Sequence, residues 1–335
     1  MIENLPPKLT WTMGVMALAI AVTGCDVTAA IDGMAVKGTF QKTLTVTGAV
    51  DLTVQAGSGS ITIQPGAGGE IKVTGHIRAR ESWRSRGVTA EEKVKRLEQR
   101  PPVEQTGNTI TVGEITDADL RDNVSITYEI VAPSSTRIRS RAGSGSMQIG
   151  DFAGPVEATD GSGSIKIGKI AERVSATTGS GSIRIDGSGP LHVETGSGSI
   201  HVAAANGSIE ATAGSGSIDL GQTGPGLVDV STGSGGITIR GARGRVKAST
   251  GSGSITADGT VADDWHLNTS SGTVTLTVPA TASFDLDART SSGSVESDHP
   301  ITMVGSIDRR HLLGKVRGGG PRLELRTSSG SIRIR

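Results

Sequence analysis

The chain has 335 residues, and its 33 basic side chains are balanced by 33 acidic ones. This balance excludes the basic surplus typical of nucleic-acid-binding proteins, so no nucleic acid is expected among the partners. With 49 glycines but only three Phe, one Tyr and three Trp, the composition also excludes a thick aromatic core and predicts a thin interior of small branched side chains.

The first 25 residues have the pattern of a bacterial lipoprotein signal. The apolar run "MGVMALAIAV" (13–22) is too short for a membrane-spanning helix, which needs about 20 residues, and is typical of a signal peptide over residues 1–24. Val22 to Cys25, "VTGC", resembles a lipobox. Cys25 is the only cysteine, so no intramolecular disulfide forms; its position favours lipidation over a stray free thiol. The protein is therefore predicted to be exported and anchored by its lipid in the bacterial cell envelope, facing the periplasm or the cell surface.

Residues 25–37 are predicted to be a tether, and residues 38–335 a single domain. Its first repeat is "DLTVQAGSGSITI", which places Leu52 and Ile61 nine positions apart. The segment 40–46 is expected to cap this end of the domain.

Residues 75–123 interrupt the repeat and contain one predicted helix at about 90–100. Thr89 is the expected N-cap, Glu92 completes a capping box, and Pro101 and Pro102 end the helix. The pairs Glu91–Lys95 and Glu92–Arg96 have i,i+4 spacing. The short apolar stripe of Val94 and Leu97 should lie against the side or end of the domain.

From Ile138 to Val295 two short templates alternate. "VSATTGSGS" begins at Val174, and "IRID" follows at Ile183, nine residues later. The full period is about 18 residues, and apolar residues alternate with polar ones as in a strand with one buried face. Such spacing argues against disorder, the other explanation for a chain so rich in Gly and Ser. It predicts an all-β fold, a single β-solenoid of two-strand coils.

Two columns of buried side chains should fill this solenoid. The first column is Val156, Val174, Leu191, Ile209, Val228, Val246, Trp265 and Phe284; the second is Ile165, Ile183, Ile200, Ile218, Ile237, Ile255 and Val274. The Gly-Ser-Gly-Ser stretches form the corners, where glycine can take a positive φ and stacked serine hydroxyls can satisfy unpaired backbone groups.

A second insert, 298–322, precedes the last rung, "LELRTSSGSIRIR". Because an exposed sheet edge invites aggregation, Arg333 and Arg335 on the final strand are predicted to guard it.

The sequence contains few candidates for chemistry. Its Gly-rich loops open onto strands rather than helices, and the Asp that calcium-binding nonapeptide repeats require is replaced by apolar residues, so no cofactor is expected. Six scattered histidines predict no metal cluster. Glu210 beside Asp229, with His192 one rung away, is the nearest approach to a paired-carboxylate site.

A solvated face of varied charge is the favoured explanation of these three residues, and it also explains His266 beside Asp285 as a surface pair. No catalytic residue is assigned, and the only predicted modification site is Cys25.

The repeat, the lipobox and the closing "GGGPRLELRTSSGSIRI" together resemble the bacterial putative-adhesin family, a β-solenoid domain of unknown function. The resemblance covers roughly residues 38 to 335. It implies a non-enzymatic envelope protein that acts as an adhesin-like binding or scaffold module, with an envelope protein or a glycan as partner. The alternatives are a carbohydrate-active enzyme, either a polysaccharide lyase or a glycoside hydrolase, and a purely structural spacer.

Overall fold

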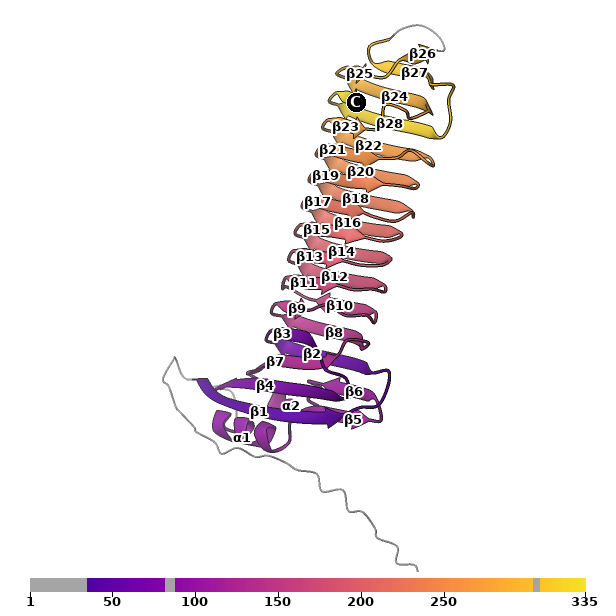
Figure 1. Cartoon of the computed structure of the whole chain (residues 1–335). Coiled ribbons are helices and arrows are strands. Elements are labelled where there is room, and N and C mark those ends of the chain that lie inside the picture. Colours follow the sequence, from indigo (N-terminus) through magenta and orange to yellow (C-terminus); the bar gives the residue numbers. More distant parts are fainter. Residues whose placement is uncertain (1–34, 82–87, 304–307) are drawn as a thin grey trace, which may run out of the picture.

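Two long β-sheets run the length of the molecule and enclose a narrow apolar core (Figure 1). The structure is a computed structural model and describes residues 35–81, 88–303 and 308–335. Each rung of the stack contributes one strand to each sheet, and successive rungs pair in parallel: Ile183 of one rung lies opposite Ile165 of the rung before it and Ile200 of the next. The predicted all-β solenoid with a period of about 18 residues is confirmed.

Sheet A has 14 strands. In spatial order they are β1 (Ala35–Thr45), β4 (Glu70–Arg80), β7 (Val124–Pro133), β3 (Ile61–Gly66), β9 (Met147–Ile149), β11 (Ile165–Lys169), β13 (Ile183–Gly187), β15 (Ile200–Ala205), β17 (Ile218–Gln222), β19 (Ile237–Ala242), β21 (Ile255–Gly259), β23 (Val274–Thr277), β29 (Ile332–Ile334) and β25 (Val295–Ser297).

Sheet B has 15 strands. In spatial order they are β26 (Ile301–Met303), β27 (His311–Val316), β24 (Phe284–Ser292), β28 (Arg322–Ser329), β22 (Trp265–Ser271), β20 (Val246–Ser252), β18 (Val228–Ser234), β16 (Ile209–Ser215), β14 (Leu191–Ser197), β12 (Val174–Ser180), β10 (Val156–Asp160), β8 (Arg137–Ser144), β2 (Asp51–Ser58), β6 (Thr109–Val112) and β5 (Val103–Thr106).

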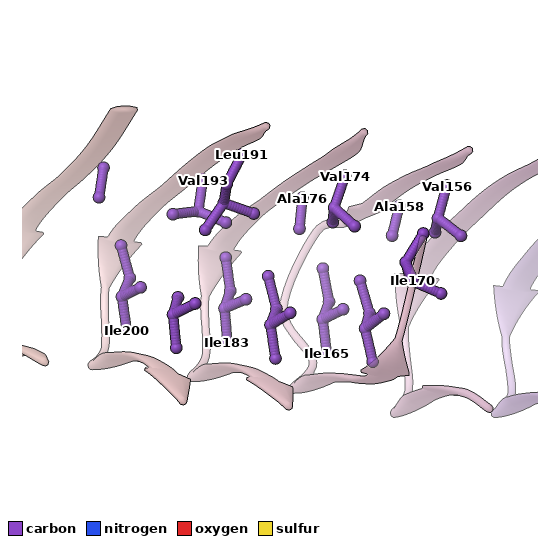
Figure 2. Packing of buried hydrophobic residues seen from close by; sticks show 14 of the residues in the cluster. Val156, Ala158, Ile165, Ile170, Val174, Ala176, Ile183, Leu191, Val193 and Ile200 are labelled. Atoms are coloured by element: carbon purple, nitrogen blue, oxygen red, sulfur yellow. The ribbon is translucent and has the colours of Figure 1, made fainter. Parts of the chain in front are cut away.

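The core is two facing rows of small branched side chains (Figure 2). Sheet A supplies pairs such as Ile183 and Ile185, and sheet B supplies smaller pairs such as Val174 and Ala176, all fully buried. Each buried Ile or Val stabilises the fold by about 1.5–3 kcal/mol relative to an exposed one. The small residues on sheet B let the two sheets approach closely, which explains why the chain folds with so few aromatic residues.

The corners depend on glycine, as predicted. Gly253 has a φ of +150°, and an added Cβ would lie 2.0 Å from the carbonyl oxygen of Gly235 in the preceding rung. Stacked corners therefore leave no space for a side chain. The hydroxyls that satisfy these corners come mainly from threonine rather than from the predicted serines: Thr250 Oγ1 donates to Gly235 O at 2.9 Å, and Thr269 Oγ1 donates to Gly253 O at 2.8 Å.

The N-terminal end is closed by β1 and a helix. Strand β1 pairs antiparallel with β4, which confirms the predicted cap around residues 40–46. Helix α1 (Ala90–Gln99) begins where predicted, since Thr89 Oγ1 accepts a hydrogen bond from Glu92 N at 3.2 Å. Its buried Val94 packs against β1 at Gly38, where an added Cβ would lie 2.3 Å from Val94 Cγ1.

The segment 75–123, predicted to interrupt the array, also extends both sheets. Its β6 pairs with β2 in register, placing Ile110 opposite Leu52, and β5 continues sheet B beyond it. A short helix, α2 (Ala118–Arg121), then leads to β7, which inserts between β4 and β3 in sheet A.

The order of the last rungs differs from the prediction. Strand β28 lies between β22 and β24, so Trp265 pairs with Leu323 rather than with the β24 rung. Leu286, not Phe284, occupies the matching position of β24, although Phe284 is also buried. Strand β28 can enter the sheet at this position because its pattern matches that of any rung.

Arg333 and Arg335 therefore do not guard a sheet edge, and that prediction is wrong. Strand β29 lies between β23 and β25. The edge of sheet B beyond β24 is instead covered by β27 and β26, two antiparallel strands from the predicted second insert.

Candidate functional site

The predicted carboxylate pair lies on the exposed face of sheet B. Glu210 and Asp229 are register partners on β16 and β18. His192 Nδ1 lies 3.0 Å from Glu210 Oε2, and Lys247 Nζ lies 3.3 Å from Asp229 Oδ2. The structure thus brings the predicted residues together. They form an open ladder in which each acid has a cationic or titratable neighbour, rather than an enclosed pair of acids.

The other predicted pair is not formed. His266 faces Glu324, with His266 Nε2 lying 3.1 Å from Glu324 Oε2, because β28 separates β22 from the strand that contains Asp285. Sequence order suggested the wrong neighbour, since β28, which follows β24 in the chain, occupies the intervening position.

Two buried carboxylates join the last rungs of sheet B. Asp287 and Glu324 are register partners and are each only 7% exposed. Arg289 Nε lies 3.1 Å and His311 Nε2 3.2 Å from Asp287 Oδ1, while Arg326 pairs with Glu324. Burial raises the pKa of Asp287, but hydrogen bonds and charge from Arg289 and His311 outweigh it and hold that pKa below its ordinary value. This cluster fastens β24, β28 and β27 together.

A cleft of about 1130 Å³ opens at the N-terminal end of the solenoid. In the regular array a Gly-Ser corner stacks on the corner of the next rung. Beyond the corner at Gly57 the connection from β6 through α2 to β7 takes that place and leaves a hollow. Gly113 allows this connection to approach β2, because an added Cβ there would lie 1.8 Å from Gln55 O.

Four arginines line this cleft, which we call the arginine cleft: Arg78, Arg80, Arg121 and Arg141. The acidic residue among its lining side chains is Glu114. Arg78 and Arg80 project from the outer face of β4, Arg121 ends α2, and Arg141 comes from β8.

Polar and buried groups complete the walls of the arginine cleft. Asn123 lies directly before β7 and Ser125 near its start, and both line the cleft. Tyr128 lines the floor, and burial raises the pKa of its phenol well above the ordinary value, so it remains a neutral hydroxyl at neutral pH. The arrangement is suited to an anion held by guanidinium groups.

Sequence reasoning did not single out the arginine cleft. The stretch "HIRAR" (76–80) alternates basic and apolar residues as an exposed strand does. That signal could have identified Arg78 and Arg80, but Arg121 and Arg141 are distant in sequence and only the fold brings them near.

The predicted lipidation site lies outside the residues that the structure describes. Cys25 and the signal peptide, residues 1–24, fall in the part of the chain that the structure does not describe. Among residues 35–81, 88–303 and 308–335, no group of three or more His, Cys, Asp or Glu is placed to hold a metal ion. Within the same ranges no helix has the length and apolar character needed to cross a membrane.

Comparison with models of known protein families gives a match in the C-terminal part of the chain. Residues 191–335 match the model of the family described as Toastrack DUF4097. The match confirms the predicted resemblance to a putative-adhesin family of unknown function. No curated protein matches the chain.

Solved structures with similarity to the chain come from three bacteria. They are a putative cell adhesion protein from Clostridium sporogenes ATCC 15579 (10% identity, covering 89% of this chain and 99% of that chain, TM-score 0.21), a putative adhesin from Bacteroides fragilis NCTC 9343 (11%, 89% and 97%, TM-score 0.32) and a putative adhesin from Parabacteroides merdae ATCC 43184 (9%, 91% and 97%, TM-score 0.30).

Proposed function

We propose that this chain, whose residues 191–335 match the Toastrack DUF4097 model, is an exported, lipid-anchored, non-enzymatic binding or scaffold module of the bacterial cell envelope. Lipid attached to Cys25 tethers it to the membrane, and the solenoid presents its sheets to an envelope protein or a glycan. The signal pattern of residues 1–25 supports the export and the anchor.

The observation that favours binding over catalysis is the exposed face of sheet B. Its strands stack in unbroken register, so side chains such as His192, Glu210, Asp229 and Lys247 form one continuous polar ladder. Stacked repeats of this kind provide extended surfaces for partners. Two-carboxylate acid–base catalysis uses carboxylates held in unlike environments. Glu210 and Asp229 instead lie side by side on an open strand face, and neither side chain is enclosed.

The anchor is tested by fractionation of cells that express the full chain. Cys25→Ala should remove incorporation of radiolabelled fatty acid and release the exported protein from the membrane fraction. A matched Ser58→Ala variant should stay membrane-bound. If Cys25→Ala remains with the membrane, the anchor assignment is wrong.

The binding surface is tested by pull-down from solubilised envelopes with the intact lipoprotein. Charge reversal on sheet B, Glu210→Arg with Asp229→Arg, should abolish capture of any partner that the wild type retains. Charge reversal on sheet A, Lys166→Glu with Arg184→Glu, is the control. Equal capture by both variants would favour a structural spacer.

The carbohydrate-active alternative has a separate test. Purified protein is incubated with envelope and plant polysaccharides, and released oligosaccharides are measured. Product release that is lost in Glu210→Ala would replace the binding proposal with an enzymatic one.

A further inference from the structure

Three of the four arginines of the arginine cleft lack the carboxylate partners that arginines on sheet B have. On sheet B, Arg137 lies 3.3 Å from Asp51, and Arg141, at the rim of the cleft, lies 3.6 Å from Glu157. Among the residues that the structure describes, Arg78, Arg80 and Arg121 make no ion pair. Glu114 is the one acidic residue among the lining residues, so these three guanidinium groups leave the hollow with an excess of positive charge that an external anion can neutralise.

The chemistry of the site favours phosphate. A guanidinium group presents a planar set of donors that matches two oxygens of a phosphate, and several around one cavity can hold a single phosphate from different sides. The volume of about 1130 Å³ exceeds that of an inorganic ion and leaves space for groups attached to the phosphate.

The arginine cleft also lies where the N-terminal segment joins the solenoid. Ala35, the first residue of β1, is the register partner of Arg80. Ten positions separate Ala35 from Cys25, and a chain of that length spans at most about 35 Å. A lipid on Cys25 therefore keeps the cleft within about 35 Å of the bilayer surface.

We propose that the arginine cleft binds the phosphate of anionic phospholipid headgroups in the membrane that holds the anchor. The location of the cleft near the membrane rests on the proposed lipidation of Cys25, whereas its preference for phosphate does not. Binding there would add a second attachment and set the angle at which the solenoid leaves the membrane surface.

Two arms separate the headgroup from a free phosphate compound. In the first, binding of glycerol 1-phosphate and of inorganic phosphate to the full chain in detergent is measured by titration calorimetry. In the second, the full chain is reconstituted into phosphatidylcholine vesicles with or without phosphatidylglycerol, and backbone hydrogen exchange is followed at residues 78–80 and 123–125.

The test variant is Arg78→Gln/Arg80→Gln/Arg121→Gln. The matched control, Arg173→Gln/Arg243→Gln/Arg335→Gln, removes the same charge from exposed positions elsewhere. Wild type and control should bind glycerol 1-phosphate at least about tenfold more tightly than the test variant. They should also show slower exchange in phosphatidylglycerol vesicles, and the test variant should not.

Three results would overturn the proposal. Binding of glycerol 1-phosphate without protection by phosphatidylglycerol would assign the cleft to a soluble phosphate compound. Equal losses in the test variant and the control would show nonspecific attraction. No binding in either arm would remove phosphate as the ligand. Failure of the Cys25 anchor would be detected separately by fractionation, because the calorimetric arm does not depend on it.

Discussion

A threonine precedes most of the Gly-Ser corners that follow sheet B strands, and its buried hydroxyl bonds to the backbone of the neighbouring bend. Thr178, Thr250 and Thr269 are almost fully buried, and each donates its hydroxyl hydrogen to a corner carbonyl of the preceding rung. A carbonyl at a tight bend cannot join the ladder of either sheet, and leaving it unpaired in the interior is costly. The hydroxyl thus gives the corner carbonyl a hydrogen-bond donor inside the stack.

Replacement of one such hydroxyl should therefore be measurable. Thr250→Val keeps the branched shape but leaves Gly235 O without its donor, and we expect the free energy of unfolding to fall by about 1–3 kcal/mol. The measurement is urea denaturation followed by circular dichroism. Thr256→Val, on the exposed face of β21, is the control and should change little; equal effects would contradict the role of the hydroxyl.

Asp287 makes the stability of the C-terminal rungs depend on pH. Its pKa in the folded protein lies below the ordinary value, so its ionised form stabilises the fold above the unfolded-state pKa of about 3.9, and this contribution is lost as pH falls through the lower folded-state pKa. We expect Asp287→Asn to be less stable than wild type at neutral pH and to converge with it in acid.

The measurement is the thermal unfolding midpoint at a series of pH values from neutral to acid. Asp298→Asn, an exposed carboxylate at the same end of the molecule, is the control and should follow the wild type. A constant gap between Asp287→Asn and wild type at every pH would contradict the assignment.

At the level of elements, the two ends of the solenoid are closed in different ways. At the N-terminal end, β1 and α1 cover the last apolar residues, and Phe40 packs edge-on against Tyr128 with ring centroids 6.4 Å apart. At the C-terminal end, β27 and β26 turn antiparallel to the stack. Antiparallel strands and a helix stop further parallel pairing, which an open rung would invite.

The fit of β1 onto β4 depends on one glycine. Gly75 faces Phe40, and an added Cβ would lie 2.2 Å from the ring carbon Cζ. We expect Gly75→Ala to destabilise the protein and Phe40→Leu to relieve the clash. The double variant should therefore be more stable than the sum of the single effects predicts, with a coupling of about 0.5–3 kcal/mol.

The coupling is measured by a double-mutant cycle in urea. Gly68→Ala, where an added Cβ meets nothing within 4 Å, replaces Gly75→Ala in the control cycle. Strict additivity in the Gly75 cycle would show that β1 shifts freely on β4.

For the whole molecule, the central rungs are interchangeable. From β10 to β22 each strand of sheet B pairs with the next in constant register, and the same core positions recur (Figure 1). Stability in such a stack is approximately a sum over rungs and their neighbours. Length is therefore adjustable without a change of fold.

Removal of two complete rungs tests whether the length of the solenoid can change while the fold is kept. Deletion of residues 191–227 joins Pro190 to Val228 and places Val228 on Val174, where Leu191 stood. We expect a folded protein whose maximum dimension, from small-angle X-ray scattering, is shorter by about 10 Å, since neighbouring strands lie about 4.8 Å apart. Deletion of 191–217, which removes one and a half rungs, should aggregate because it joins β13 directly to β17, two strands of the same sheet, where the stack requires alternation between the sheets.

The two candidate sites differ in how far sequence spacing could predict which residues lie together. His192, Glu210 and Asp229 could be placed on one face from their spacing alone, because the regular rungs repeat that spacing in space. The residues of the arginine cleft could not be brought together by spacing, because β4, α2 and β8 come close only at the irregular end of the stack. Periodicity predicts neighbours only where the period continues.

The sequence by itself determined the repeated unit: alternation placed the core residues, glycine placed the corners, and Thr89 with Pro101 bounded α1. These features depend on local side-chain direction and backbone freedom, so a few neighbouring residues in the sequence suffice to predict them. Only the tertiary structure decided that β28 lies between β22 and β24 and that the connection through α2 leaves a cleft. Parallel rungs with the same pattern can pair with many partners, and the choice among them depends on how both ends of the chain cover the stack.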